Sequence, residues 1–129
     1  MSDLRTPAVE ALLNVFVGVQ DNDTAFALLE DLFTIREIKE TSQRLSVARM
    51  LDSGKPYVAI EEATGASATT IARVSKALNY GSGGYRTALK ILDEREAAAS
   101  QGGADASADS GAAASGGTEG ETGKENQTA

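Results

Sequence analysis

The amino-acid sequence predicts an all-α protein, and three observations support this fold class. Apolar residues recur at helical spacing through most of residues 1–96. Helix start and stop signals separate these periodic segments from one another. A stretch with strand-like composition, residues 57–60, is short and lacks a partner strand, so we assign it to the start of a helix. We therefore expect one helical domain over residues 1–96.

Two helices are expected at the start of the chain. Thr6 is a suitable N-cap and Pro7 suits a first helical position, so the first helix should run from Pro7 to about Val19. The Asp21-Asn22-Asp23 segment breaks it and offers a cap for the second helix. Their apolar positions are Val9, Leu12, Leu13, Phe16 and Val17, then Phe26, Leu28, Leu29, Leu32 and Phe33. Such wide apolar arcs fit either an obligate dimer or a monomeric helical core, and composition does not choose between them.

A third, longer helix is expected to begin after Thr34. The segment Thr34-Ile35-Arg36-Glu37 has the spacing of a capping box, in which Thr bonds forward and Glu reaches back. The helix should end at Ser53-Gly54, because Gly is common just after the last residue of a helix. Pro56, two residues further on, cannot continue the helix. Its inward positions are Ile35, Ile38, Leu45, Ala48 and Leu51.

Residues 59–78 have the pattern of a helix-turn-helix, which is two short helices joined by a tight turn. Gly65 supplies the turn, because a residue without Cβ adopts positive φ at no steric cost. Ser67 is placed to cap the second helix of the motif. In proteins with this motif, the second helix reads DNA in the major groove.

The second helix of the motif divides into two faces. At about 100° per residue, Ile71, Val74 and Leu78 fall on one side, as packing against a core requires. The candidate DNA-binding residues lie at its start and on its other side: Ser67, Ala68, Thr69, Thr70, Arg73 and Lys76. Hydroxyls and cations suit phosphate and base-edge contacts, and small Ala side chains permit close approach. An ordinary solvated helix face is the alternative interpretation of the same spacing.

The end of the chain differs in composition from the rest. A loop over 79–84 and a last helix from about Tyr85 to Ala98 are expected. Residues 97–129 are rich in Ala, Gly, Ser and acidic residues and hold no aromatic or branched apolar side chain, so they cannot offset their chain entropy by burial. We expect a disordered acidic tail over 97–129. A solvating tail and a tail that competes with DNA for the basic surface are both compatible with this composition.

The distribution of charge matters more than its total. The chain has a net charge of −7, but residues 97–129 alone hold five carboxylates and one lysine, a net charge of −4. Residues 63–92 hold four cations, Arg73, Lys76, Arg86 and Lys90, and no acid. Because local sign governs docking, this segment is compatible with a nucleic-acid partner despite the acidic total.

Composition also excludes several function classes. The chain has no Cys and no His, so disulfides, the usual zinc, haem and iron–sulfur ligand sets, and Cys–His or Ser–His nucleophiles cannot form. We therefore expect no enzyme activity, no metal and no cofactor. No apolar run approaches the roughly 20 residues of a membrane span, and no leader pattern opens the chain. A cytoplasmic protein without a membrane partner is expected.

Five segments occur in a characteristic order and spacing. They are LEDLFTIRE at 29–37, QRLSVA at 43–48, LDSGKPY at 51–57, TGASATTIARVSKAL at 64–78 and NYG at 79–81. With them, the chain from about Thr6 to Leu92 resembles the tryptophan-repressor superfamily, in particular its YerC/YecD-type branch. The resemblance implies a TrpR-like all-α fold, an intertwined homodimer, and one helix-turn-helix per subunit that binds double-stranded DNA.

The same resemblance suggests a candidate effector pocket. Arg44 and Arg73 match the two arginines that sandwich the co-repressor indole in the family, and Thr34 matches its pocket threonine. Val74 stands where the repressor has a glycine, and Ala77 where it has a serine that bonds the ligand's amino group. These two departures argue against tryptophan as the effector. A structural role for Arg44 at the surface is the alternative.

The sequence thus predicts a sequence-specific DNA-binding transcriptional regulator, expected to be a repressor, that acts as a dimer. Thr69, Thr70 and Arg73 are the expected base-facing residues, and Ser67 and Lys76 the expected phosphate contacts. The alternative is a helical protein–protein interaction module whose apolar faces and acidic tail bind another protein. A small-molecule sensor that uses the Arg44 and Arg73 region is compatible with the first prediction.

Overall fold

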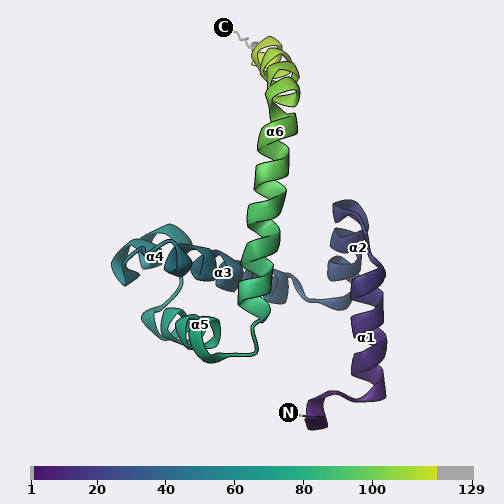
Figure 1. Ribbon diagram of the computed structural model, residues 1–129, viewed down its shortest axis with the longest axis vertical. Coiled ribbons are helices and arrows are strands. Elements are labelled where there is room, and N and C mark those ends of the chain that lie inside the picture. Colours follow the sequence, from purple (N-terminus) through teal and green to yellow (C-terminus); the bar gives the residue numbers. More distant parts are fainter. Residues whose placement is uncertain (1, 119–129) are drawn as a thin grey trace, which may run out of the picture. The chain divides into compact units, whose positions relative to one another are not determined.

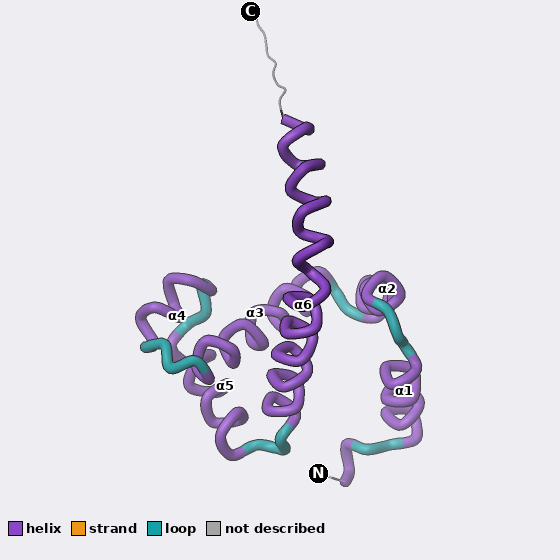
Figure 2. Tube along the Cα trace, turned by 45° about the horizontal axis from the view of Figure 1, so that its top comes forward, coloured by secondary structure: helices purple, strands orange, loops and turns teal. Residues whose placement is uncertain are grey.

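The computed structural model describes residues 2–118, and these form helices joined by short loops (Figures 1 and 2). The elements are a short 3-10 helix η1 (Ser2–Leu4), then α1 (Pro7–Gly18), α2 (Asn22–Leu32), α3 (Ile35–Asp52), α4 (Tyr57–Thr64), α5 (Ala68–Tyr80) and α6 (Gly84–Thr118). Within this range no strand is present. The predicted all-α fold class is therefore confirmed.

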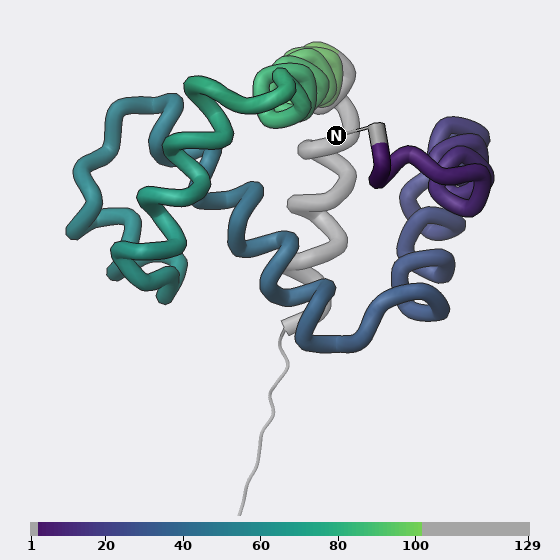
Figure 3. Tube along the Cα trace, turned by 90° about the horizontal axis from the view of Figure 1, so that it is seen from below, coloured from purple at the N-terminus to yellow at the C-terminus, as the bar shows by residue number. Residues whose placement is uncertain are grey.

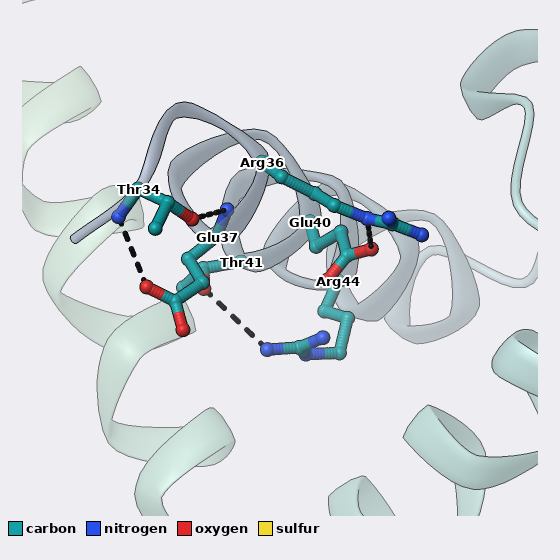
Figure 4. Close-up of polar contacts among 6 residues, drawn as sticks. All are labelled: Thr34, Arg36, Glu37, Glu40, Thr41 and Arg44. Atoms are coloured by element: carbon teal, nitrogen blue, oxygen red, sulfur yellow. Dashed lines mark hydrogen bonds and ion pairs between the residues drawn. The ribbon is translucent and has the colours of Figure 1, made fainter.

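Side-chain caps fix where the first three helices begin. Thr6 Oγ1 accepts a hydrogen bond from the Val9 amide at 3.2 Å, and Pro7 occupies the first position of α1. Asp21 accepts from the Thr24 amide at 2.8 Å, and this bond lowers the pKa of the Asp21 carboxyl below its ordinary value. At α3 the expected capping box is present, with Thr34 and Glu37 bonded reciprocally at 3.1 and 2.9 Å (Figure 4).

The chain divides into two compact units after Lys76. In the first unit, α3 is the central element. The α1 and α2 pair lies at one end of α3, and α4 with the start of α5 lies at the other end (Figures 1 and 3). α3 packs against α4 and contacts α2.

The core of the first unit is built by the helix-turn-helix and the C-terminal half of α3. Its buried side chains are Val47, Ala48, Ile60, Ala66, Ile71 and Val74. The second unit buries Leu78 and Leu89. In contrast, α1 and α2 contribute no buried residue. Among the described residues, the helix-turn-helix with the adjoining half of α3 thus has the most consolidated core.

The structure differs from expectation at the ends of α5 and α6. α5 includes Asn79 and Tyr80, which the sequence predicts in a loop, because the Gly81 amide still donates to the Ala77 carbonyl at 2.9 Å. α6 continues to Thr118, beyond the expected end at Ala98 and into the segment expected to be disordered. Repeated Ala, the residue with the highest helix propensity, favours this continuation. The remainder of the expected tail, residues 119–129, lies outside the described residues, and the predicted domain boundary after residue 96 stays a prediction.

Candidate nucleic-acid interface

The turn between α4 and α5 is held by hydrogen bonds from both sides. Thr64 Oγ1 donates to the Ile60 carbonyl at 2.7 Å and accepts from the Ala66 amide at 3.1 Å. Gln43 Nε2 on α3 donates to the Thr64 carbonyl at 3.0 Å. Gly65 ends α4 with φ of 76°, in the left-handed region expected from the sequence. These bonds fix the direction in which the chain enters α5.

Ser67 caps α5, as its position in the sequence indicates. Its Oγ accepts from the Thr70 amide at 3.1 Å and donates to Thr70 Oγ1 at 3.1 Å. Thr70 is half-buried, whereas Ser67 and the adjacent Ala68 are exposed. Two of the three hydroxyls of the predicted DNA-binding set, those of Ser67 and Thr70, therefore bond to each other, which orients the first turn of α5.

The exposed face of α5 carries a continuous stripe of polar residues, which we call the α5 stripe: Thr69, Arg73, Lys76 and Tyr80. Their spacing of four, three and four residues places them along one side of a helix. Within residues 3–101, whose side chains the structure describes, the Arg73 and Lys76 side chains form no hydrogen bond or ion pair. The α5 stripe thus presents two unpaired cations to solvent, opposite the buried side chains Ile71 and Val74.

Three of these stripe residues are predicted from the sequence, and Tyr80 is not. The sequence places Tyr80 in a loop, although its spacing of seven residues from Arg73 carries the signal of a shared helix face. Arg86, at the start of α6, is distinguished in the sequence only as one of the four cations of residues 63–92, and no motif there marks it as a contact residue. In the second unit its Nη2 donates to Asn79 Oδ1 at 3.0 Å, so it is tied to the last turn of α5.

Acidic side chains stand on α4, the first helix of the motif. Glu61 and Glu62 are both exposed. Carboxylates in this position repel phosphate, so α4 supplies little electrostatic attraction for DNA. Any contact with a polyanion must therefore depend on α5 and the residues that flank it.

The candidate effector residues lie on different elements. Thr34 is the N-cap of α3, and its hydroxyl is used in the capping box. Arg44 is exposed in the middle of α3, where its Nη2 donates to Thr41 Oγ1 at 3.4 Å (Figure 4). Arg73 lies on the α5 stripe. No hydrogen bond joins these three residues to one another, and their role as a pocket stays a prediction.

None of the helices among the described residues is long and apolar enough to span a membrane.

Comparison with known proteins finds a matching family and relatives of similar sequence. The family model of the Trp repressor protein matches residues 8–93. The uncharacterised protein YerC of Bacillus subtilis (strain 168) is 43% identical over 93 residues, which are 72% of this chain and 89% of YerC.

Two solved structures are similar in fold and in sequence. The crystal structure of a TrpR-like protein from Eubacterium eligens ATCC 27750 has a TM-score of 0.69 at 43% identity, and the match covers 72% of this chain and 96% of that one. A candidate Trp repressor from Staphylococcus aureus has a TM-score of 0.68 at 34% identity, covering 71% and 92%. The helix-turn-helix geometry and these matches together show that the chain belongs to the Trp repressor family.

Proposed function

We propose that the protein is a sequence-specific DNA-binding transcriptional regulator, acting as a repressor, that docks α5 in the major groove of double-stranded DNA. The observation that carries this proposal is the α5 stripe. Arg73 and Lys76 are exposed and unpaired there, on a helix whose other face is buried and whose start is fixed by hydrogen bonds. Family membership supports a DNA-binding role of this kind.

The residues of α5 suit different parts of the DNA. Thr69 and Arg73 are assigned to base edges, because an arginine can bond both acceptors of guanine and a threonine can bond or contact any base. Lys76, further along the helix, is assigned to phosphate as a point charge. Small Ala68 allows the backbone to approach the groove. The sequence predicts Thr70 to face a base and Ser67 to contact phosphate, and both assignments stay part of the proposal. The hydrogen bonds between these two residues support it by fixing the first turn of α5.

A symmetric dimer is part of the proposal, because α1 and α2 leave large apolar side chains uncovered in the protomer. Val17 on α1 is 84% exposed, and Ile35, the first residue of the adjoining α3, is 74% exposed although the sequence predicts it to face inward. Val15, Phe16, Phe26 and Leu32 are also exposed. A second copy of the chain would bury this surface and would place two α5 helices on a two-fold related site, about one helical turn apart.

A single substitution that introduces a charge tests the proposed dimer. Val17→Asp costs the protomer little, because Val17 is already exposed, but it places a carboxylate in the proposed interface. We expect light scattering to show a monomer for Val17→Asp and a dimer for Gln20→Glu, which adds the same charge at an exposed polar position after α1. A dimer for both variants would contradict the assignment of this surface.

The DNA-binding proposal is tested by selection from genomic DNA. The full chain is mixed with fragments of its own genome at two salt concentrations, and the retained DNA is sequenced. Recovery of a palindromic site supports a dimeric, sequence-specific regulator. Salt-sensitive retention of all fragments would instead indicate an architectural binder, and no retention would contradict DNA binding by the free protein.

Two substitutions on α5 then separate the assigned roles. Arg73→Ala should weaken binding to the recovered site by about 1–3 kcal/mol and relax its specificity. Lys76→Ala should weaken binding to all sequences and reduce the salt dependence. Fluorescence anisotropy with the recovered site and with random DNA measures both effects. Equal losses for the two variants on random DNA would contradict the division of roles.

The second candidate function is a protein–protein interaction module, and the uncovered apolar surface of α1 and α2 is the observation that favours it. It predicts no affinity for the recovered DNA and a stoichiometric partner in pull-down experiments. A third role, sensing a small anionic effector near Arg44 and Arg73, is compatible with DNA binding. A metabolite panel in a thermal-shift assay would test it, since a ligand at 100 times its Kd adds about 2.7 kcal/mol of stability.

A further inference from the structure

We propose that Tyr80 and Arg86 form a second contact with the DNA backbone, at the C-terminal end of α5, and that Asn79 positions Arg86 for this contact. The inference rests on the proposed DNA-binding function and extends it to residues outside the predicted set. The partner is the sugar-phosphate chain that borders the major groove.

Tyr80 continues the α5 stripe to the last residue of the helix. It follows Arg73 by seven residues and is 85% exposed. Its phenol forms no hydrogen bond with residues 3–101, the part of the chain with described side chains. A tyrosine combines an apolar ring with a polar tip, which suits a surface that is apolar on one side and charged on the other. Deoxyribose and phosphate together form such a surface.

The length of the stripe determines what Tyr80 reaches. At 1.5 Å per residue, Thr69 and Tyr80 lie about 16 Å apart along α5. The major groove is only about 12 Å wide. If the first turns of α5 reach base edges, the last turn therefore lies at the wall of the groove. The phenol O–H at this wall meets a phosphate oxygen rather than a base.

A phosphate at the end of a helix needs a nearby cation, because the C-terminus of a helix carries partial negative charge. The last turn of α5 contains no basic residue. Arg86 supplies the charge from the first turn of α6, since its Nη2 donates to Asn79 Oδ1 at 3.0 Å. A guanidinium has five N–H donors, so it can keep this bond while it donates to a phosphate.

The backbone between Tyr80 and Arg86 is also constrained, at Gly81. The Gly81 amide donates to the Ala77 carbonyl oxygen at 2.9 Å, and a Cβ at Gly81 would lie only 2.3 Å from that oxygen. Any larger residue would displace the segment that follows Tyr80. Glycine at this position therefore allows α5 to end directly after Tyr80. The segment that follows can then bring the Arg86 side chain back to Asn79.

The test uses the full-length chain and the DNA site recovered by genomic selection. Binding is measured by fluorescence anisotropy at several salt concentrations for Arg86→Ala, Asn79→Ala and Tyr80→Phe. Arg95→Ala is the matched control, because Arg95 is exposed on the same helix, nine residues on and therefore on the opposite face from Arg86. Circular dichroism checks that each variant is folded.

Each variant has its own expected signature. Arg86→Ala should weaken binding roughly tenfold and lower the salt slope by about 0.9 for each phosphate that the side chain would neutralise. Asn79→Ala keeps the charge, so it should weaken binding by about threefold with the salt slope unchanged. Tyr80→Phe removes one donor and should also cost about threefold without a change in slope. Arg95→Ala should bind as the unsubstituted chain does.

The outcomes distinguish this inference from the proposed function. If Arg73→Ala weakens binding while Arg86→Ala behaves like Arg95→Ala, the inference is overturned and the DNA-binding function stands. The inference is likewise overturned if Asn79→Ala and Arg86→Ala change the salt slope equally, because Asn79 would then not act through Arg86. If the unsubstituted chain retains no DNA, both proposals fail together.

Discussion

Replacing Gly65 with alanine should destabilise the protein by about 1 kcal/mol, for a reason confined to the backbone. Gly65 has φ of 76°, and an L-residue in the left-handed region costs roughly 1–2 kcal/mol. A Cβ at this position would meet nothing closer than Gln43 Nε2 at 3.9 Å, which is ordinary van der Waals contact. Alanine also reduces the freedom of the unfolded chain, which returns about 0.4–1 kcal/mol. The net cost is therefore small and purely conformational.

Urea denaturation followed by circular dichroism measures this cost. All variants must be compared at one protein concentration, because the stability of the proposed dimer would depend on it. Gly65→Asn should be less destabilised than Gly65→Ala, since Asn tolerates the left-handed region. Gly18→Ala is the comparison for a glycine without positive φ. Gly18 is the last residue of α1 and an added Cβ there meets nothing within 4 Å, so the helix propensity of alanine should leave this variant unchanged or up to about 1 kcal/mol more stable.

Two results would refute this reasoning. If Gly65→Ala were as stable as Gly18→Ala, the left-handed backbone at the turn would not be required. If the variant were destabilised by more than about 3 kcal/mol, the cost would exceed what the backbone term supplies and would indicate a steric conflict that the structure does not contain. The expected result lies between these limits: Gly65→Ala is destabilised by about 1 kcal/mol, and Gly65→Asn is destabilised less than Gly65→Ala.

Two further predictions concern charge. Because the Thr24 amide lowers the pKa of Asp21 in the folded state, the Asp21 contribution to stability is present above the ordinary carboxyl pKa and is lost as pH falls through the lowered one. Asp21→Asn, which caps without titrating, should flatten this part of a thermal-unfolding pH profile, and an unchanged profile would contradict the assignment. Removal of the residues after Ala99, which carry a net charge of −4, should raise DNA affinity most at low salt, where charge repulsion is least screened. If the full and the shortened chain gave equal anisotropy titrations at low salt, the residues after Ala99 would not compete with DNA, and a solvating role would remain for them.

Local signals predict most of the helix boundaries. Thr6, Asp21, Thr34 and Ser67 each cap the helix that the sequence assigns to them, because capping depends on residues only three positions apart. The predicted end of α5 is too early. Glycines from Gly81 onward indicate a loop, but the i to i+4 hydrogen bonds persist through Tyr80, and no residue type marks where they stop.

The candidate site is predictable only where one helix contains it. Thr69, Arg73 and Lys76 share a face because of their spacing, so periodicity alone identifies them. The Asn79 to Arg86 bond joins two helices across a loop, and the Gln43 to Thr64 bond joins α3 to the end of α4. Contacts between elements depend on how the chain turns, which spacing along one helix does not encode.

These two inter-helix bonds have a common consequence for recognition. Gln43 holds the turn that precedes α5, and Asn79 at the last turn of α5 holds Arg86. If α5 docks on DNA as proposed, a helix whose first and last turns are both tied to neighbouring segments would lose little further freedom on binding, so more of its contact energy would remain to discriminate between base sequences. In the proposed complex, the exposed cations on the α5 stripe would attract any DNA, whereas the orientation of the helix would determine which sequence is favoured. For this acidic chain, the position of its few unpaired cations therefore matters more than its net charge.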